Sequence, residues 1–222
     1  MTFRSILAAE IESFIQARSR LMEQYSDAWW AARLGKATAS RISDIVAKTK
    51  SGWGASRANY EAELIAERLT GATGESFTNS AMQWGTDTEP QARAAYEFMT
   101  DIEVTQVGFI GHPTIEASGA SPDGLAGHEG MVEIKCPKTS THLATLLGAS
   151  IPKKYMTQMQ WQMCCAGRAW CDFVSFDPRL PAKHQLFVKR ISRDAEMIAD
   201  LEAAVREFLA EVDAKMTKLE AL

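Results

Sequence analysis

The chain has 222 residues, 46% of them hydrophobic and 23% charged, which is ordinary for a globular protein of one domain with a sizeable core. No apolar run reaches the roughly 18 residues of a membrane span, so a membrane protein is not expected. The formal net charge of −4 argues against a protein that coats nucleic acid through bulk positive charge, although it leaves room for a local basic groove.

Helical periodicity, bounded by capping residues and glycines, accounts for much of the chain. It predicts helices over residues 1–24, 27–35, 38–48, 57–70, 79–99, 140–148, 153–167 and 193–220. The first of these carries acidic residues and continues amphipathically, which indicates a helix and not a signal peptide. Pro90 falls inside its predicted helix and indicates a kink or a restart there. A Gly/Ser-rich loop is expected over residues 49–56.

Five apolar or alternating runs are typical of strands. They cover residues 101–112, 115–121, 131–137, 169–178 and 184–192. These elements predict an α/β (α+β) fold, a mixed sheet of about five strands flanked by helices. A single domain over residues 1–222 is expected, with the helices 1–24 and 193–220 as additions to its core.

The four cysteines contain no C-x-x-C pair, and three of them lie in apolar surroundings. They are Cys136, Cys164, Cys165 and Cys171. Buried free thiols are expected, because this spacing does not suit a disulfide framework. An iron–sulfur cluster is disfavoured, since adjacent Cys164 and Cys165 would point to different faces of a helix. Free thiols are typical of a reducing compartment such as the cytoplasm.

One strand carries charges that an apolar run does not need. Glu133 and Lys135 flank Ile134, so both side chains project from the same face of the sheet. Asp123 ends the turn before this strand, where its carboxylate can meet Glu133. Two close carboxylates repel unless a cation lies between them, and Mg²⁺ or Mn²⁺ with oxygen ligands is the natural occupant. The Ile134 carbonyl is a further candidate ligand.

The alternative interpretation is a solvated E-x-K pair with an aspartate upstream by chance. The apolar context "MVEIKCP" favours the site, because charges in it are not expected to be free in solvent. Such a site suits phosphodiester hydrolysis, in which Lys135 would orient or help deprotonate water and stabilise the charge on phosphorus.

A later helix and an earlier glutamate could complete the site. Tyr155, Gln158 and Gln162 lie close to one helical face, with Gln160 beside it. They either flank the metal site or face solvent. Glu89 offers a further carboxylate, although a lone helical glutamate is usually a surface residue.

Five motifs occur in a fixed order along the chain. They are "DAWWAARLGKATASRISDIVAK", "WGTDTEPQAR", "SPDGL", "VEIKCPKTS" and "YMTQMQWQM". This order and spacing resemble the YqaJ-like viral recombinase nucleases, the lambda exonuclease family of the PD-(D/E)XK superfamily. The resemblance covers about residues 25–180.

The resemblance implies a restriction-endonuclease-like core and a Mg²⁺-dependent exonuclease, with two ions expected and Mn²⁺ able to substitute. Such enzymes degrade the 5′-ended strand of duplex DNA to mononucleotides and leave a 3′ single strand. The resemblance also implies binding to double-stranded DNA ends, a ring of three subunits and a phage-type single-strand annealing protein as partner. The implied place of action is the cytoplasm of a bacterial host.

Carried over residue by residue, the resemblance assigns the metal ligands and the catalytic groups. The ligands would be Asp123, Glu133, Glu89 and the backbone carbonyl of Ile134. Lys135 would be the catalytic lysine and Gln158 the glutamine of the flanking helix.

The resemblance also implies that the terminal 5′-phosphate is bound by Arg33, Ser40 and Ser121. A guanidinium binds phosphate bidentately, and the start of a helix adds amide donors. The Gly-rich loop offers further DNA contacts, with Trp53 stacking at the strand junction beside Lys48, Lys50 and Arg57. A loop without DNA contacts is the alternative.

Two other functions stay open from the sequence. One is an endonuclease or single-strand nuclease of the same fold, and the other is an inactive module that binds DNA ends. The pair Arg33 and Ser40 favours end recognition, and the complete set of Asp123, Glu133 and Lys135 favours catalysis.

Overall fold

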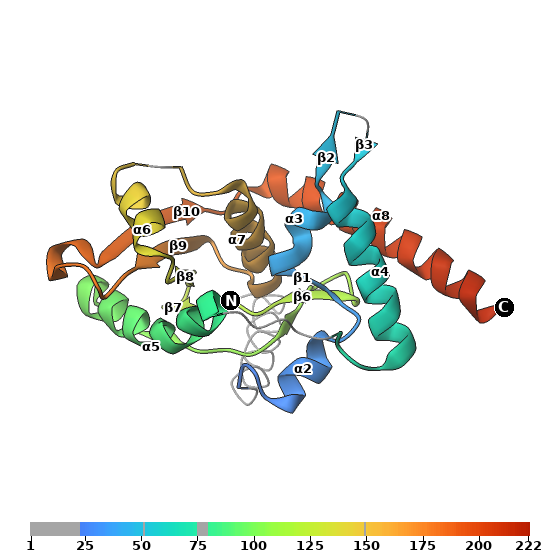
Figure 1. Ribbon diagram of the computed structural model, residues 1–222, viewed down its shortest axis with the longest axis horizontal. Helices are drawn as coiled ribbons and strands as arrows, with labels where there is room; N and C mark the ends of the chain where they lie inside the picture. Colours follow the sequence, from blue (N-terminus) through green and yellow to red (C-terminus); the bar gives the residue numbers. More distant parts are fainter. Residues whose placement is uncertain (1–22, 51, 75–79, 149) are drawn as a thin grey trace, which may run out of the picture.

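The computed structural model describes residues 23–50, 52–74, 80–148 and 150–222 (Figure 1). Its helices are α2 (Asp27–Arg33), α3 (Ile42–Ile45), α4 (Ala55–Thr70), α5 (Ser80–Thr100), α6 (Thr139–Leu146), α7 (Lys153–Ala166) and α8 (Ala195–Glu220), with short 3-10 turns η1 (Ala39–Arg41) and η2 (Ala182–His184). The helix expected over residues 1–24 lies almost entirely outside the described residues.

The strands form a central sheet, a small sheet and a hairpin. They are β1 (Ala37–Thr38), β2 (Lys48–Thr49), β3 (Gly52–Trp53), β4 (Val104–Thr105), β5 (Ile110–Gly111), β6 (Ser118–Ala120), β7 (Gly124–Ala126), β8 (Gly130–Lys135), β9 (Trp170–Phe176) and β10 (Leu186–Ser192). The central sheet has five strands in the order β10-β9-β8-β7-β4. Only β8 and β9 in it run parallel, so the predicted mixed sheet of five strands is confirmed.

Helices cover both faces of this sheet, and the alternation of strand side chains decides which residues meet which helix. Ile134 of β8 packs in one cluster with Tyr96 of α5. Met131 of the same strand packs in the other cluster, which contains the apolar residues of α7. Glu133 and Lys135 share the face of Met131 and therefore lie under α7.

The C-terminal helix α8 lies away from the central sheet, beside α4 (Figure 1). It buries a stripe that includes Leu201, Val205 and Val212 against α3, α4 and α7. Of the helices in the described ranges, none is both long and apolar enough to cross a bilayer. The predicted free thiols are confirmed, since all four cysteines are unbridged and three of them are buried.

The strand predicted over residues 101–112 is wrong as a single element. It divides into β4, which pairs with β7 in the central sheet, and β5, which pairs with β6 in the small sheet. Val104 and Ile110 are both buried, but in different apolar clusters. Alternation along the chain cannot reveal that the segment changes sheets.

Strand β7 follows the turn that ends at Asp123, and no strand was expected there. All three of its residues are buried, and Gly124 pairs with Val132 of β8. A Cβ added to Gly124 would lie 2.2 Å from Cγ1 of Val104 on the neighbouring strand β4. Glycine is therefore needed here for the close approach of strands, and not for a turn.

Helix α2 begins at Asp27, as expected, and is capped by Ser26, whose side chain accepts the N–H of Trp29. Two other expectations near the beginning of the chain need correction. The helix expected over residues 38–48 is shorter, since Thr38 belongs to β1 and only η1 and α3 are helical. The loop expected over residues 49–56 contains the β2–β3 hairpin.

Candidate active site

Strands β7 and β8 separate at Asp123. Their last paired residues are Gly124 and Val132, so Asp123 lies one position beyond the ladder, across from Glu133. The Asp123 carboxylate accepts the backbone N–H of Ile134 at 2.6 Å. Because the N–H and C=O of one strand residue point to the same side, the Ile134 carbonyl also faces Asp123. The Asp123 carboxylate and the Ile134 carbonyl, the two candidate metal ligands, thus face one opening in the sheet.

Glu133 is fully buried, with 0% of its surface exposed, and donors hold both of its oxygens. Its Oε1 accepts a hydrogen bond of 2.7 Å from Nε2 of Gln158 and forms an ion pair with the ammonium of Lys135. Its Oε2 accepts a hydrogen bond of 2.7 Å from Nε2 of Gln162. Three donors on one carboxylate fix its orientation.

The sequence places Gln162 on the helix face of Gln158, where it either flanks the metal site or faces solvent, but assigns it no partner. The only available signal is the spacing of four residues, which puts both side chains on the same side of α7. Gln160, between them, points elsewhere: its Nε2 donates to the Ser192 carbonyl and its Oε1 accepts the N–H of Asp194.

Electrostatic interactions couple these groups. Burial, and then the negative charge of Glu133, raise the pKa of Asp123 well above its usual value of 3.8. Burial alone would lower the pKa of Lys135, but the charges of Glu133 and Asp123 outweigh it and raise this pKa. Lys135 is therefore a stable cation, with its Nζ 5.3 Å from the centroid of the Tyr155 ring. Two neighbouring carboxylates, one of which raises the pKa of the other, are a suitable set of ligands for a divalent cation.

Glu89 lies close enough to the same opening to take part in this coupling. Burial raises the pKa of Glu89, while the charges of Arg93 and Lys135 act in the opposite direction. An ion pair of 2.5 Å joins Glu89 Oε1 to Nη2 of Arg93, one turn further along α5. Pro90 does not break the helix, since α5 continues from Ser80 to Thr100. Glu89 is thus held by a helical neighbour at the edge of the site.

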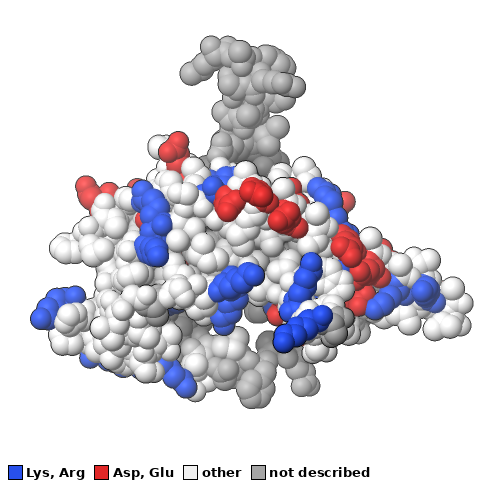
Figure 2. All heavy atoms as spheres, turned by 90° about the horizontal axis from the view of Figure 1, so that it is seen from above, with Lys and Arg blue, Asp and Glu red and all other residues white. Residues whose placement is uncertain are grey.

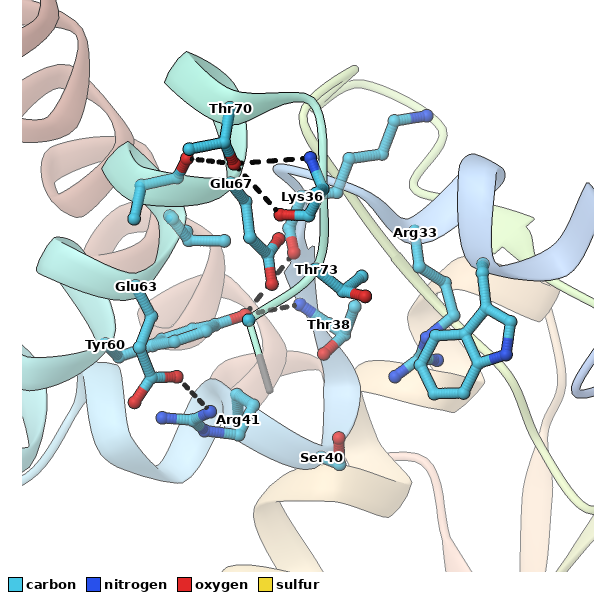
Figure 3. A pocket seen from close by; sticks show the side chains of 15 residues that line it. Arg33, Lys36, Thr38, Ser40, Arg41, Tyr60, Glu63, Glu67, Thr70 and Thr73 are labelled. Atoms are coloured by element: carbon cyan, nitrogen blue, oxygen red, sulfur yellow. Dashed lines mark hydrogen bonds and ion pairs between the residues drawn. The ribbon is translucent and has the colours of Figure 1, made fainter. Parts of the chain in front are cut away.

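Two of the three residues expected to bind the 5′-phosphate lie on a cavity of about 800 Å³ between α2, η1 and α4 (Figure 3). Arg33 and Ser40 both line it. The Arg33 Nη1 donates to the Ser121 hydroxyl at 3.0 Å, and the indole N–H of Trp29 donates to the same oxygen at 2.9 Å. Arg33 forms no salt bridge within the described part of the chain. Arg41, which also lines the cavity, is neutralised by Asp44 and Glu63.

The expected DNA-binding loop divides into exposed and buried parts. Lys48 and Trp53 pair in the β2–β3 hairpin, with Trp53 40% exposed and Nζ of Lys48 4.8 Å from its ring. Arg57 is only 3% exposed; it donates to the Ile45 carbonyl and forms two bonds of 3.0 Å to Glu211 of α8. The expected DNA contact of Arg57 is therefore at odds with the structure, which gives it a part in joining α4 to α8.

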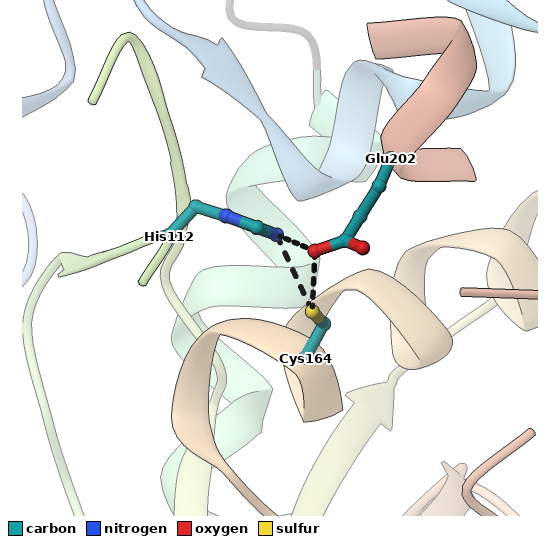
Figure 4. A group of neighbouring side chains, drawn as sticks. All are labelled: His112, Cys164 and Glu202. Carbon is teal, nitrogen blue, oxygen red and sulfur yellow. Dashed lines mark hydrogen bonds and ion pairs between the residues drawn. The ribbon is translucent and has the colours of Figure 1, made fainter. Parts of the chain in front are cut away.

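A second group of polar side chains lies elsewhere, between β5, α7 and α8 (Figure 4). It consists of His112, Cys164 and Glu202. The Nδ1 of His112 accepts the N–H groups of Thr114 and Ile115, both at 3.2 Å, so the ring proton of neutral His112 lies on Nε2. This Nε2 faces Glu202 Oε1 at 3.1 Å. A metal on Nε2 would move the proton to Nδ1, against two N–H donors, so the group is a hydrogen-bonded cluster and a poor cation site.

Comparison with known proteins places this arrangement in a family. The YqaJ-like viral recombinase domain matches residues 28–169. An alkaline exonuclease from Laribacter hongkongensis is 52% identical, with a TM-score of 0.83 over 88% of this chain and 97% of its own, and its structure in complex with dAMP matches equally well. A phage-related exonuclease from Haemophilus somnus shares the fold at 16% identity, with a TM-score of 0.64 over 83% of this chain and 96% of its own.

No curated protein matches the chain. The family match covers more than half of the sequence, and the five-stranded mixed sheet with its flanking helices is the PD-(D/E)XK nuclease fold. The chain therefore belongs to the YqaJ-like viral recombinase family.

Proposed function

We propose that this protein is a metal-dependent exonuclease that digests the 5′-ended strand of linear double-stranded DNA to mononucleotides. The observation behind the proposal is the group formed by Asp123, Glu133 and Lys135, where two carboxylates and an ammonium meet at a gap in the sheet. Glu133 is fully buried and Asp123 and Lys135 are half-buried, and charges in such positions are costly unless the site uses them.

The donor set fits a hard divalent cation, with Mg²⁺ proposed and Mn²⁺ as a substitute. Asp123, Glu133, the Ile134 carbonyl and Glu89 would hold it. Two ions are proposed, and such ions polarise a phosphoryl oxygen, lower the pKa of water and stabilise the leaving oxygen. The protein itself supplies Lys135, whose raised pKa keeps the ammonium charged, so we assign it to stabilisation of the charge that develops on phosphorus. Gln158 fixes Glu133 in orientation.

The short distance between the proposed 5′-phosphate site, at Ser121, and the carboxylate of Asp123 supports an exonuclease that removes one nucleotide at a time. Ser121, which binds Arg33, is two residues from Asp123, so their Cα atoms are at most about 7 Å apart. One nucleotide spans a comparable distance between its neighbouring phosphates. A terminal phosphate held by Arg33, Ser40 and Ser121 would thus leave the next phosphodiester near Asp123.

The relatives support the same activity. The 52% identical protein from L. hongkongensis is an alkaline exonuclease, and its complex contains dAMP, a deoxynucleoside monophosphate. The product class that we propose here is the same, a 5′-mononucleotide.

The surface charge is compatible with DNA binding despite the net charge of −4. On the face in Figure 2, most acidic side chains gather in the upper half of the view and most basic ones in the lower half. The exposed hairpin with Lys48, Lys50 and Trp53 is a further proposed DNA contact.

The remaining features of the proposal come from the family resemblance. They are a ring of three subunits around the DNA, a phage-type single-strand annealing protein that loads on the 3′ strand, and action in the bacterial cytoplasm. Light scattering tests the trimer directly. Co-purification with the annealing protein encoded beside the gene, at micromolar concentration and low salt, tests the partner.

The decisive experiment compares four DNA substrates with Mg²⁺ and with EDTA: a linear duplex, a linear single strand, a nicked circle and a closed circle. Labels on the 5′ end of one strand and the 3′ end of the other give the polarity, and chromatography identifies the products. We expect Mg²⁺-dependent release of mononucleotides from 5′ ends of the linear duplex and no attack on the closed circle.

Each alternative gives a different result. Cutting of the closed circle would assign an endonuclease, and digestion of single strands alone would assign a single-strand nuclease. Binding of ends without cleavage, at any divalent cation, would assign an end-binding module.

A further inference from the structure

The buried glutamine Gln162 differs from the other glutamines of α7 in what it binds. Its only hydrogen bond to a described residue is the one of 2.7 Å from Nε2 to Oε2 of Glu133. The side chain is 0% exposed, and its Oε1 is buried without a partner among the described residues. A buried amide oxygen with no partner costs free energy, so a residue that only supported the fold would be better replaced by an apolar one.

Gln160 on the same helix shows what a structural glutamine does here. Both ends of its amide bind backbone groups, the carbonyl of Ser192 and the N–H of Asp194, and so join α7 to the segment between β10 and α8. Gln162 joins no backbone segments. Its hydrogen bond serves one carboxylate.

The two oxygens of Glu133 are not equally supported. Oε1 has two donors, Gln158 and Lys135, whereas Oε2 has Gln162 as its donor within the described ranges. Without Gln162, the carboxylate would be held at one oxygen only and could rotate about its terminal bond. An amide on each side, four residues apart on one rigid helix, fixes the plane of the carboxylate.

We propose that Gln162 is a positioning residue that orients Glu133 for the divalent cation of the proposed nuclease site. The inference rests on the proposed function, and it concerns a residue to which neither the sequence motifs nor the comparisons give a role. Partners that orient metal-binding carboxylates typically change metal affinity or activity about 10- to 100-fold when they are removed.

The test uses Gln162→Leu, Gln162→Met as a second variant of similar shape, and Gln160→Leu as the matched control. Titration calorimetry with Mn²⁺ on the full chain without DNA gives metal affinity, and thermal unfolding gives stability. For both Gln162 variants we expect Mn²⁺ binding about tenfold weaker. We also expect a lower unfolding temperature, because Oε2 of the buried Glu133 loses its donor within the described ranges. For Gln160→Leu we expect a lower unfolding temperature and unchanged Mn²⁺ affinity of the folded protein.

Steady-state digestion adds a second readout. In both Gln162 variants the Mn²⁺ concentration for half-maximal rate should rise about tenfold, with KM for DNA unchanged. Wild-type Mn²⁺ affinity in both variants, or a loss of stability without a loss of affinity, overturns the inference. Failure of the proposed function is distinct from this, because the wild type itself would then neither bind Mn²⁺ nor cleave DNA.

Discussion

Asp123 and Ile134 are joined by a hydrogen bond of 2.6 Å, from the backbone N–H of Ile134 to the Asp123 carboxylate, at the point where β7 leaves β8. The carboxylate takes the place of a strand partner, so it is fixed by the sheet itself. This hydrogen bond needs an oxygen acceptor but no negative charge, whereas the proposed metal binding needs the charge. A mutation can therefore separate the structural role of Asp123 from its proposed catalytic role.

Asp123→Asn should keep the fold and lose the activity. Asparagine retains an acceptor for the Ile134 N–H and also relieves the repulsion from Glu133, so the unfolding temperature should be unchanged or higher. Loss of the charged ligand should lower DNA digestion by at least about 100-fold. Circular dichroism and a digestion assay with end-labelled linear duplex measure the two effects. Near wild-type digestion would remove Asp123 from the proposed site.

Lys135→Met should strongly slow digestion and leave metal binding measurable. The proposed part of Lys135 is to stabilise charge in the transition state, and loss of one such group costs about 10²–10³-fold in kcat. Mn²⁺ should still bind the variant in calorimetry, because the carboxylates and the Ile134 carbonyl remain. If kcat in Lys135→Met stayed within a few-fold of the wild type, Lys135 would have no catalytic part.

The raised pKa of Asp123 predicts how stability depends on pH in the protein without metal. Because the folded-state pKa lies above the usual 3.8, the folded state holds a proton that the unfolded state has lost. This contribution is complete at low pH and is lost as pH rises through the folded-state pKa. As pH increases, the unfolding temperature of the wild type should therefore fall relative to that of Asp123→Asn. The fall should be roughly 2–4 °C for each kcal/mol lost from the free energy of unfolding.

Saturating Mg²⁺ provides the control for this prediction. The cation competes with the proton for the carboxylate, so its stabilising effect on the wild type should grow with pH. Parallel curves of unfolding temperature against pH for wild type and Asp123→Asn would contradict the assigned pKa. The comparison cancels titration of His112 and other groups common to both proteins.

Much of this site follows from short-range geometry that the sequence contains. A spacing of two residues puts Glu133 and Lys135 on one face of a strand, and a spacing of four puts Gln158 and Gln162 on one face of a helix. An apolar strand with two charges is informative because burying them needs partners. What the spacing cannot tell is whether a glutamine faces solvent or a carboxylate, and so the role of Gln162 was not predicted.

The parts that could not be predicted depend on distant contacts. Gly124 lies in a strand, where the absence of a side chain lets Val104 approach closely. The sequence alone does not distinguish such a glycine from one in a turn. Arg57 resembles a surface cation of a basic loop, but its partner Glu211 is 154 residues away. Local patterns predict elements and faces, whereas the pairing of such distant groups is decided by tertiary packing.

Arg33→Ala should weaken the preference for phosphorylated 5′ ends. The guanidinium of Arg33 lies on the cavity beside Ser121 and has no carboxylate partner among the described residues, so it is available to a phosphate. We expect the rate ratio between phosphorylated and hydroxyl ends to fall about tenfold or more, as loss of a charged hydrogen bond of about 1.5–3 kcal/mol implies.

Arg41→Ala is the matched control for this effect. Arg41 lines the same cavity, but Asp44 and Glu63 already neutralise its charge at 2.7 and 2.6 Å. Its removal should change the end preference by less than Arg33→Ala does. An unchanged ratio in Arg33→Ala would assign recognition of the 5′ end to other residues.

Glu211→Gln should lower stability without lowering DNA digestion. The buried Arg57 would keep its bond to Ile45 but lose a charged partner on α8. The expected loss is about 1–2 kcal/mol, in the lower part of the range for charged hydrogen bonds, because the Glu211 side chain is 40% exposed. Urea unfolding measures it, with Glu207→Gln, an exposed position of the same helix, as the control for the change in charge.

Digestion well below the unfolding transition should equal that of the wild type, since Arg57 joins two helices in this structure. A variant that kept its stability but bound DNA differently would return Arg57 to the DNA-binding surface.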